Sequence, residues 1–188
     1  PSCYKKDIGK DEIRYKGYHE LAYLHQNYFK PDASVLDDFG LSKDDKIIIL
    51  RFVSWDAHHD IRDRGFTNVI DAVRSLERYG RILITSEKKL PEELEKYRIT
   101  VPSEKIHHLL YFATLYIGES ATMASESAML GTPSIFVSTS RRGYTDELES
   151  RYGLVYNFSD PEKGQEYALE KAVKLLEDEN LKRSEERR

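Results

Sequence analysis

Short apolar runs alternate along most of the chain with longer segments in which apolar and polar residues recur at helical spacing. Runs such as residues 46–53 are apolar nearly throughout, which is typical of strands buried on both faces of a parallel sheet. Residues 66–79 instead place their apolar side chains on one helical stripe, and Gly80 ends that helix. The pattern predicts strands at residues 46–53, 81–85, 99–101, 114–117, 134–137 and 154–156, and helices at residues 20–25, 33–41, 66–79, 91–97, 103–112, 122–130, 144–152 and 160–180.

This alternation of strands and helices with short connections predicts the fold class. It favours an α/β fold, a Rossmann-like doubly wound parallel sheet. In such sheets ligands bind beyond the carboxyl ends of the strands, near the point where the strand order reverses. The loops that follow Val53, Ile117 and Val137 are therefore the strongest candidates for a ligand site.

Composition and charge narrow the functional classes. The chain has 188 residues, of which 39% are apolar, and a formal net charge of −4. These values suit one domain with a real core and do not indicate nucleic-acid binding. No apolar run approaches the ~20 residues of a membrane span, so we expect none, and no signal peptide is apparent. Cys3 is the only cysteine, which excludes an internal disulfide and makes a cytoplasmic location the default.

The stretch from Gly118 to Pro133 is the main candidate for binding chemistry. Small residues stand at the predicted helix start, so a ligand such as phosphate could approach the backbone N–H groups there; they are Ser120, Ala121 and Thr122. Glu126 is the only ionisable side chain between Ser120 and Ser140, and burying it requires hydrogen-bond donors. Glu126 either accepts hydroxyl groups of a sugar or caps a neighbouring loop in a packing helix.

The loop after the first predicted strand, residues 54–64, is the densest polar cluster in the chain. Its His58 or His59 is a candidate proton-transfer or phosphate-binding group. A metal site is less favoured, because adjacent histidines point in different directions on most backbones, and we assign no metal. The alternative is a solvated loop with internal salt links.

The loop after the fifth predicted strand, residues 138–144, holds hydroxyl groups and guanidinium groups that could clamp an anion; the candidates are Ser138, Arg141 and Arg142. The alternative is a basic surface turn that opposes Asp146 and Glu147. The pair His107-His108 is interpreted as structural or surface. Neither a dinucleotide-binding glycine motif nor a P-loop is present, which argues against a dehydrogenase or a P-loop kinase, and we assign no cofactor.

The two ends of the chain differ from its centre. Residues 1–33 carry tyrosines among charged side chains, which is typical of a connector that packs against something else, although ordinary surface tyrosines are an equal interpretation. Residues 181–188 form a charged tail. The predicted domain is therefore residues 34–180.

The central stretch resembles a known signature. Nucleotide-sugar proteins of the GT-B type, in particular the UDP-N-acetylglucosamine 2-epimerase group, have Asp-Ser-Gly-Gly, three residues, Glu, and a Leu-Gly-x-Pro end. This chain has Glu119-Ser-Ala-Thr122, then Glu126, then Leu130-Gly-Thr-Pro133. The resemblance implies that Glu126 contacts the ribose of a nucleotide sugar, with a UDP-sugar as the expected ligand, while residues 120–122 face its diphosphate. The glycine pair is replaced by Ala121-Thr122, which narrows the approach to the backbone.

The whole chain is also similar to the carboxyl-terminal half of a GT-B-like family of unknown function, through segments 1–9, 18–25 and 51–60. This similarity implies that residues 1–33 connect two halves and that the partner is the missing amino-terminal half; a homo-oligomer is the other association expected of an exposed half. His58 or His59 is then nearest to a cleft-facing histidine of the epimerase group. We expect a nucleotide-sugar-binding half of a glycosyltransferase or 2-epimerase; the alternative is a non-catalytic binding or assembly module.

Overall fold

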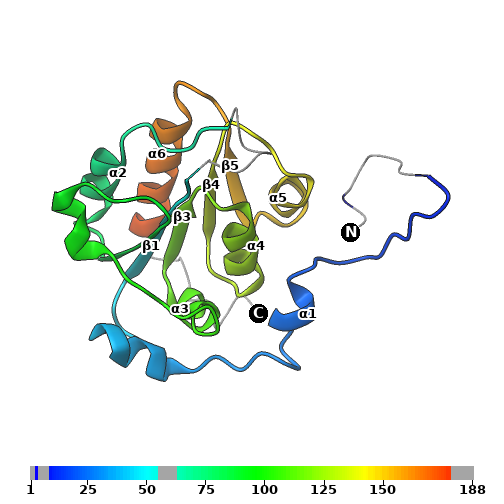
Figure 1. The fold of residues 1–188 in the computed structure, drawn as a ribbon, viewed down its shortest axis with the longest axis horizontal. Coiled ribbons are helices and arrows are strands. Elements are labelled where there is room, and N and C mark those ends of the chain that lie inside the picture. The colour runs from blue at the N-terminus through cyan, green and yellow to red at the C-terminus, as the bar shows by residue number, and fades with distance from the viewer. Residues whose placement is uncertain (1–2, 4–8, 55–62, 179–188) are drawn as a thin grey trace.

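A five-stranded parallel sheet forms the centre of the protein (Figure 1), in a computed structural model that describes residues 3, 9–54 and 63–178. The strand order is β2-β1-β3-β4-β5, and all neighbouring strands run parallel. The strands are β1 (Ile47–Phe52), β2 (Arg81–Ser86), β3 (Leu115–Gly118), β4 (Ser134–Val137) and β5 (Val155–Phe158). The predicted α/β class with a parallel sheet is confirmed.

Helices cover both faces of this sheet. On one face lie α2 (Val69–Leu76), η2 (Glu92–Tyr97) and α6 (Gly164–Glu177). On the other lie α1 (Leu21–Leu24), η1 (Ala33–Phe39), α3 (Ile106–Phe112) and α4 (Ala121–Met129), with α5 (Gly143–Glu147) and η3 (Leu148–Tyr152) beside α4. No helix among the described residues is both long and apolar enough to cross a membrane.

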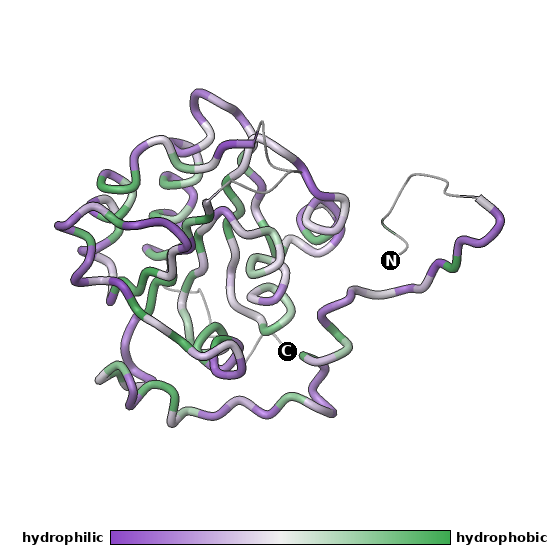
Figure 2. The backbone as a smooth tube through the Cα atoms, in the orientation of Figure 1, coloured by the Kyte–Doolittle hydropathy of each residue, from purple (hydrophilic) through white to green (hydrophobic). Residues whose placement is uncertain are grey.

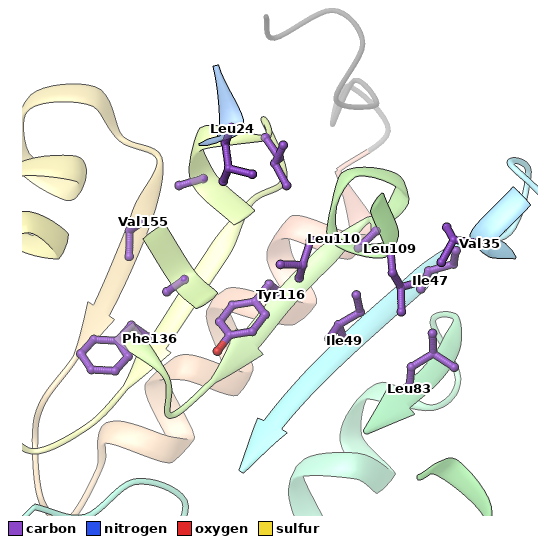
Figure 3. Packing of buried hydrophobic residues seen from close by; sticks show 14 of the residues in the cluster. Leu24, Val35, Ile47, Ile49, Leu83, Leu109, Leu110, Tyr116, Phe136 and Val155 are labelled. Carbon is purple, nitrogen blue, oxygen red and sulfur yellow. The ribbon is translucent and has the colours of Figure 1, made fainter. Parts of the chain in front are cut away.

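Each face of the sheet builds its own apolar core because successive side chains of a strand point to opposite faces. In β1, Ile47 and Ile49 belong to the core under α3 and α4, whereas Ile48 and Leu50 belong to the core under α2 and α6. Figure 3 shows the ring of Tyr116 between Ile49 and Phe136 in the first of these cores. Along the backbone, apolar residues concentrate in the strands and polar residues in the outer turns (Figure 2).

Several predicted elements differ from those in the structure. Residues 99–101 do not form a strand, and only a single bridge joins Arg98 to Ile84. Ile99 N donates to Ile84 O at 2.9 Å, but the pairing ends there, and Pro102 has no N–H to extend a ladder. The helix predicted from residue 66 begins at residue 69, because the Asn68 side chain accepts the N–H groups of Ile70 and Asp71.

Three shorter helices also differ in type. The helices expected at residues 33–41 and 91–97 are 3₁₀ helices, and Gly40 ends the first in a left-handed conformation with φ of 60°. The helix expected at residues 144–152 is α5 followed by one turn of π-helix, η3.

Residues 18–32, here called the strap, run along the outside of α5, α4 and α3 before the chain enters η1 (Figure 1). Tyr18 donates a hydrogen bond to Glu147 Oε2 at 3.1 Å, and Asp32 N donates to His108 Nδ1 at 3.0 Å. Phe29 stacks on the His108 ring with centroids 4.9 Å apart. Leu24 is only 5% exposed and joins the core beside α4. The strap is therefore packed on the domain.

Candidate functional site

The strand order places the candidate loops at one edge. The chain passes from β1 outward to β2 and then returns to β3 on the other side of β1, so the order reverses between β1 and β3. Arg51 of β1 pairs in register with Gly118 of β3, which brings the carboxyl ends of these two strands together. Because all five strands are parallel, the loop after β4 leaves from the same edge. The three loops selected from the sequence therefore all leave their strands at the edge where ligands of such sheets bind.

The start of α4 is fixed by two hydrogen bonds. Ser120 caps the helix, since its Oγ accepts the Met123 N–H at 3.3 Å, and the buried Tyr116 hydroxyl donates to Ser120 O at 3.1 Å. The intrahelical bonds begin with Ala124 N to Ser120 O. The N–H groups of Ala121 and Thr122 precede that first bond, so they belong to the helix end that suits an anion. Thr122 is exposed and Ala121 partly so.

Glu126 is buried within α4, with 7% of its surface exposed. Its Oε1 receives a hydrogen bond from the Tyr23 hydroxyl of the strap at 2.9 Å and lies 2.9 Å from His107 Nε2 of α3. Burial of the phenol raises the pKa of Tyr23, and the hydrogen bond to the Glu126 carboxylate raises it further. The phenol therefore keeps its proton and donates. The donors that a buried carboxylate requires are thus supplied by Tyr23 and His107. From the sequence, Tyr23 is assigned to the connector, and His107 is interpreted as structural or surface.

Glu119, directly after β3, is a residue whose role the sequence did not reveal. The residue is 5% exposed, and its carboxylate accepts two backbone N–H groups, that of Val53 at 2.8 Å and that of Phe66 at 2.7 Å. These two residues stand on either side of the polar loop after β1. Glu119 therefore fixes both ends of that loop against β3. An acidic residue immediately after a fully buried strand was the available signal.

The loop after β4 is tied to the end of the loop after β1. Thr139 and Arg64 exchange two hydrogen bonds, one from Arg64 N at 2.9 Å and one from Thr139 N at 2.8 Å. Arg142 donates to Ser140 Oγ at 2.6 Å and to Asp63 Oδ2 at 3.4 Å. The structure thus brings these two loops together at the edge of the sheet, with a guanidinium between them.

The other two candidates of this loop have local partners. Ser138 is buried, and its Oγ lies 3.1 Å from that of Ser140. Arg141 is exposed over 56% of its side chain and donates to Asp146 Oδ1 at 2.9 Å, and Asp146 is one of the two residues named in the surface-turn interpretation. His58 and His59 lie outside the described residues, so their interpretation as proton-transfer groups stays a prediction.

The sheet order, its two helical layers and the switch point define a Rossmann-like α/β domain that matches one half of GT-B-type structures. The chain belongs to the family described as "Protein of unknown function (DUF354)", whose model matches residues 4–186.

One solved structure shows the same fold, and others are more distantly similar. A candidate UDP-N-acetylglucosamine 2-epimerase from Listeria monocytogenes is similar with a TM-score of 0.52 and 15% identity, over 86% of this chain and 43% of that one. The wall teichoic acid polymerase TagF is similar with a TM-score of 0.44 and 17% identity, over 89% of this chain and 46% of that one. The chain thus spans less than half the length of these proteins. No curated protein sequence matches it.

Proposed function

We propose that this chain is the nucleotide-diphosphate-sugar-binding half of a GT-B-type glycosyltransferase or sugar 2-epimerase-like protein, with a UDP-sugar as its ligand. The observation that carries the proposal is the position of Glu126, a buried carboxylate in the helix that starts at the switch point of the sheet. A carboxylate there suits the hydroxyl groups of a ribose whose diphosphate meets the start of the same helix.

The remaining groups have roles that follow from this placement. The diphosphate meets the backbone N–H groups of Ala121 and Thr122, beside the Ser120 cap. The loop after β4 supplies cationic charge at the same edge through Arg142, with Arg141 and Ser138 nearby. His58 or His59, in the loop after β1, is the proposed catalytic group of this half. An amino-terminal half supplies the acceptor or the further acid and base groups.

A second function, a non-catalytic binding or assembly module on the same fold, is favoured by one observation. Glu126 already accepts a hydrogen bond from Tyr23 and contacts His107 within the domain. A carboxylate with such partners is also what a purely structural contact between strap and helix requires. The two functions differ in what happens when the charge of Glu126 is removed.

Titration calorimetry of UDP against the wild-type protein and Glu126→Gln separates them, with thermal melts of both. If Glu126 binds ribose, the substitution leaves folding nearly intact and weakens UDP binding by roughly 1.5–3 kcal/mol, as for a hydrogen bond to a charged group. Half of a cleft binds weakly, so ligand is used at millimolar concentration, and the measurement is repeated on the protein with its amino-terminal half.

Glu147→Gln is the matched control, because Glu147 also accepts a hydrogen bond from a strap tyrosine, Tyr18, but lies in α5. We expect this variant to bind UDP as the wild type does. Unchanged affinity in Glu126→Gln together with a large fall in its melting temperature would make Glu126 a structural residue and favour the assembly module.

A further inference from the structure

The two side chains that contact Glu126 meet it at one oxygen. The Tyr23 hydroxyl and His107 Nε2 each lie 2.9 Å from Oε1, and none of the contacts among the described residues involves Oε2. The two donors come from separate elements, Tyr23 from the strap and His107 from α3. Their rings lie against each other, with centroids 5.4 Å apart and a tilt of 42° between the planes.

This arrangement fixes the direction of the carboxylate. An ionised carboxylate only accepts hydrogen bonds and has room for about four of them on its two oxygens. Two donors on Oε1 resist rotation of the group, because turning it would break both bonds together. Because an ionised carboxylate only accepts, the contact requires the His107 tautomer that carries its proton on Nε2. Oε2 is the oxygen left for a hydroxyl of a ligand.

We infer that Tyr23 and His107 are positioning residues that hold Glu126 Oε1 so that Oε2 accepts a ribose hydroxyl of the nucleotide. This inference rests on the proposed function and adds to it: the strap, through Tyr23, takes part in recognising the nucleoside. Removing the Tyr23 hydroxyl leaves the charge of Glu126 in place but frees the carboxylate to turn. The selectivity for the ribose hydroxyl falls as a result, more than the affinity for the diphosphate does.

The test measures that selectivity by titration calorimetry on the full chain. The selectivity ratio is the dissociation constant of the 2′-deoxy or 3′-deoxy analogue divided by that of UDP. In the wild-type protein we expect one deoxy analogue to bind roughly tenfold or more weakly than UDP, the loss of a hydrogen bond to a charged group. Tyr23→Phe should lower that ratio several-fold. The matched control is Tyr18→Phe, which removes the other tyrosine–carboxylate bond of the strap and should keep the wild-type ratio.

A second pair of variants addresses the other donor. His107→Ala removes the donor and should lower the ratio, whereas His107→Gln keeps an N–H and should restore much of it. Circular dichroism melts verify that each variant is folded at the temperature of titration, and the Phe and Gln variants keep nearly the original side-chain volume.

The outcomes distinguish this inference from the function it rests on. A wild-type protein that discriminates, with an undiminished ratio in Tyr23→Phe, overturns the positioning role and leaves the proposed function standing. An equal fall in Tyr18→Phe and Tyr23→Phe also overturns it, because general docking of the strap then explains the effect. A wild-type protein without any preference for the ribose hydroxyls overturns the proposed function and this inference together.

Discussion

Gly65 lies against the carboxylate of Glu119, with no room for a side chain between them. A Cβ at Gly65 would stand 2.1 Å from Glu119 Oε1 and 2.4 Å from the carboxyl carbon. The same oxygen accepts the N–H of Phe66, the residue that follows Gly65. The end of the loop after β1 is thus held to β3 by a contact that only glycine permits.

Gly65→Ala should therefore destabilise the protein. The added methyl group displaces the Glu119 carboxylate, which leaves the N–H groups of Val53 and Phe66 without their acceptor. A buried N–H group without a hydrogen-bond acceptor costs about 1–3 kcal/mol. We therefore expect a loss of that order in the free energy of unfolding, measured by urea denaturation.

The matched control is Gly164→Ala at the start of α6. A Cβ there would meet Phe158 O at 3.5 Å, an ordinary contact, and alanine favours helix formation. This variant should be as stable as the wild type or slightly more stable. Equal stability of Gly65→Ala and Gly164→Ala would contradict the role given to the Glu119 contact.

Leu24→Ala tests whether the strap belongs to the folded unit. Leu24 is 5% exposed and packs in the core beside α4, so truncating it should cost about 2–5 kcal/mol of unfolding free energy. Tyr28→Ala, four residues on, removes a side chain that is 76% exposed and should change stability by no more than about 0.5 kcal/mol. A single cooperative melt with a lowered midpoint for Leu24→Ala is expected; two variants of equal stability would mean that the strap is not docked.

Asp160 should give the protein a stability contribution that is lost in acid. Its Oδ1 accepts the N–H groups of Lys163 at 2.8 Å and Glu162 at 2.9 Å, and these bonds lower the pKa of Asp160 from its ordinary value of 3.8. A carboxyl group with a lowered pKa in the folded state stabilises that state fully above its ordinary pKa, and the contribution disappears as the pH falls through the lowered value.

The measurement is the difference in melting temperature between the wild type and Asp160→Asn across a pH series. Asparagine keeps an acceptor oxygen but carries no charge, so it resembles the protonated aspartic acid. The wild type should melt higher at neutral pH, and the difference should close in acid. A difference in melting temperature that stays constant into strong acid would contradict the claim that these hydrogen bonds stabilise the ionised form of Asp160.

The sheet could be predicted from the sequence because its strands are buried on both faces. Short, nearly continuous apolar runs such as residues 46–53 are typical of buried strands. Because amphipathic helices connect them, the strands are expected to run parallel. The predicted strand at residues 99–101 was wrong because three residues of β-type composition are too few to specify strand pairing, and Pro102, which follows them, cannot continue a ladder. The shared edge of the three candidate loops follows from the parallel order alone.

The partners of the buried carboxylates could not be predicted in the same way. Tyr23 and Glu126 are 103 positions apart, and Glu119 bonds to N–H groups 66 and 53 positions away. Local pattern shows that a carboxylate near an apolar face needs donors, but it does not show which distant residues provide them. For the same reason the sequence did not indicate a role for His107, although its ring contacts the carboxylate of Glu126.

The strap has a consequence for how two halves of a larger protein would move. Tyr18, Tyr23 and Phe29 each fasten it to a different helix, α5, α4 and α3 in turn. If the proposed amino-terminal half precedes this domain, a hinge at residue 33 would have to break all three contacts, so we expect the bending point upstream of Tyr18. Under that proposal, rotation of the preceding half would load Tyr18 first and Tyr23 next, and Tyr23 is the strap residue that contacts the carboxylate of Glu126.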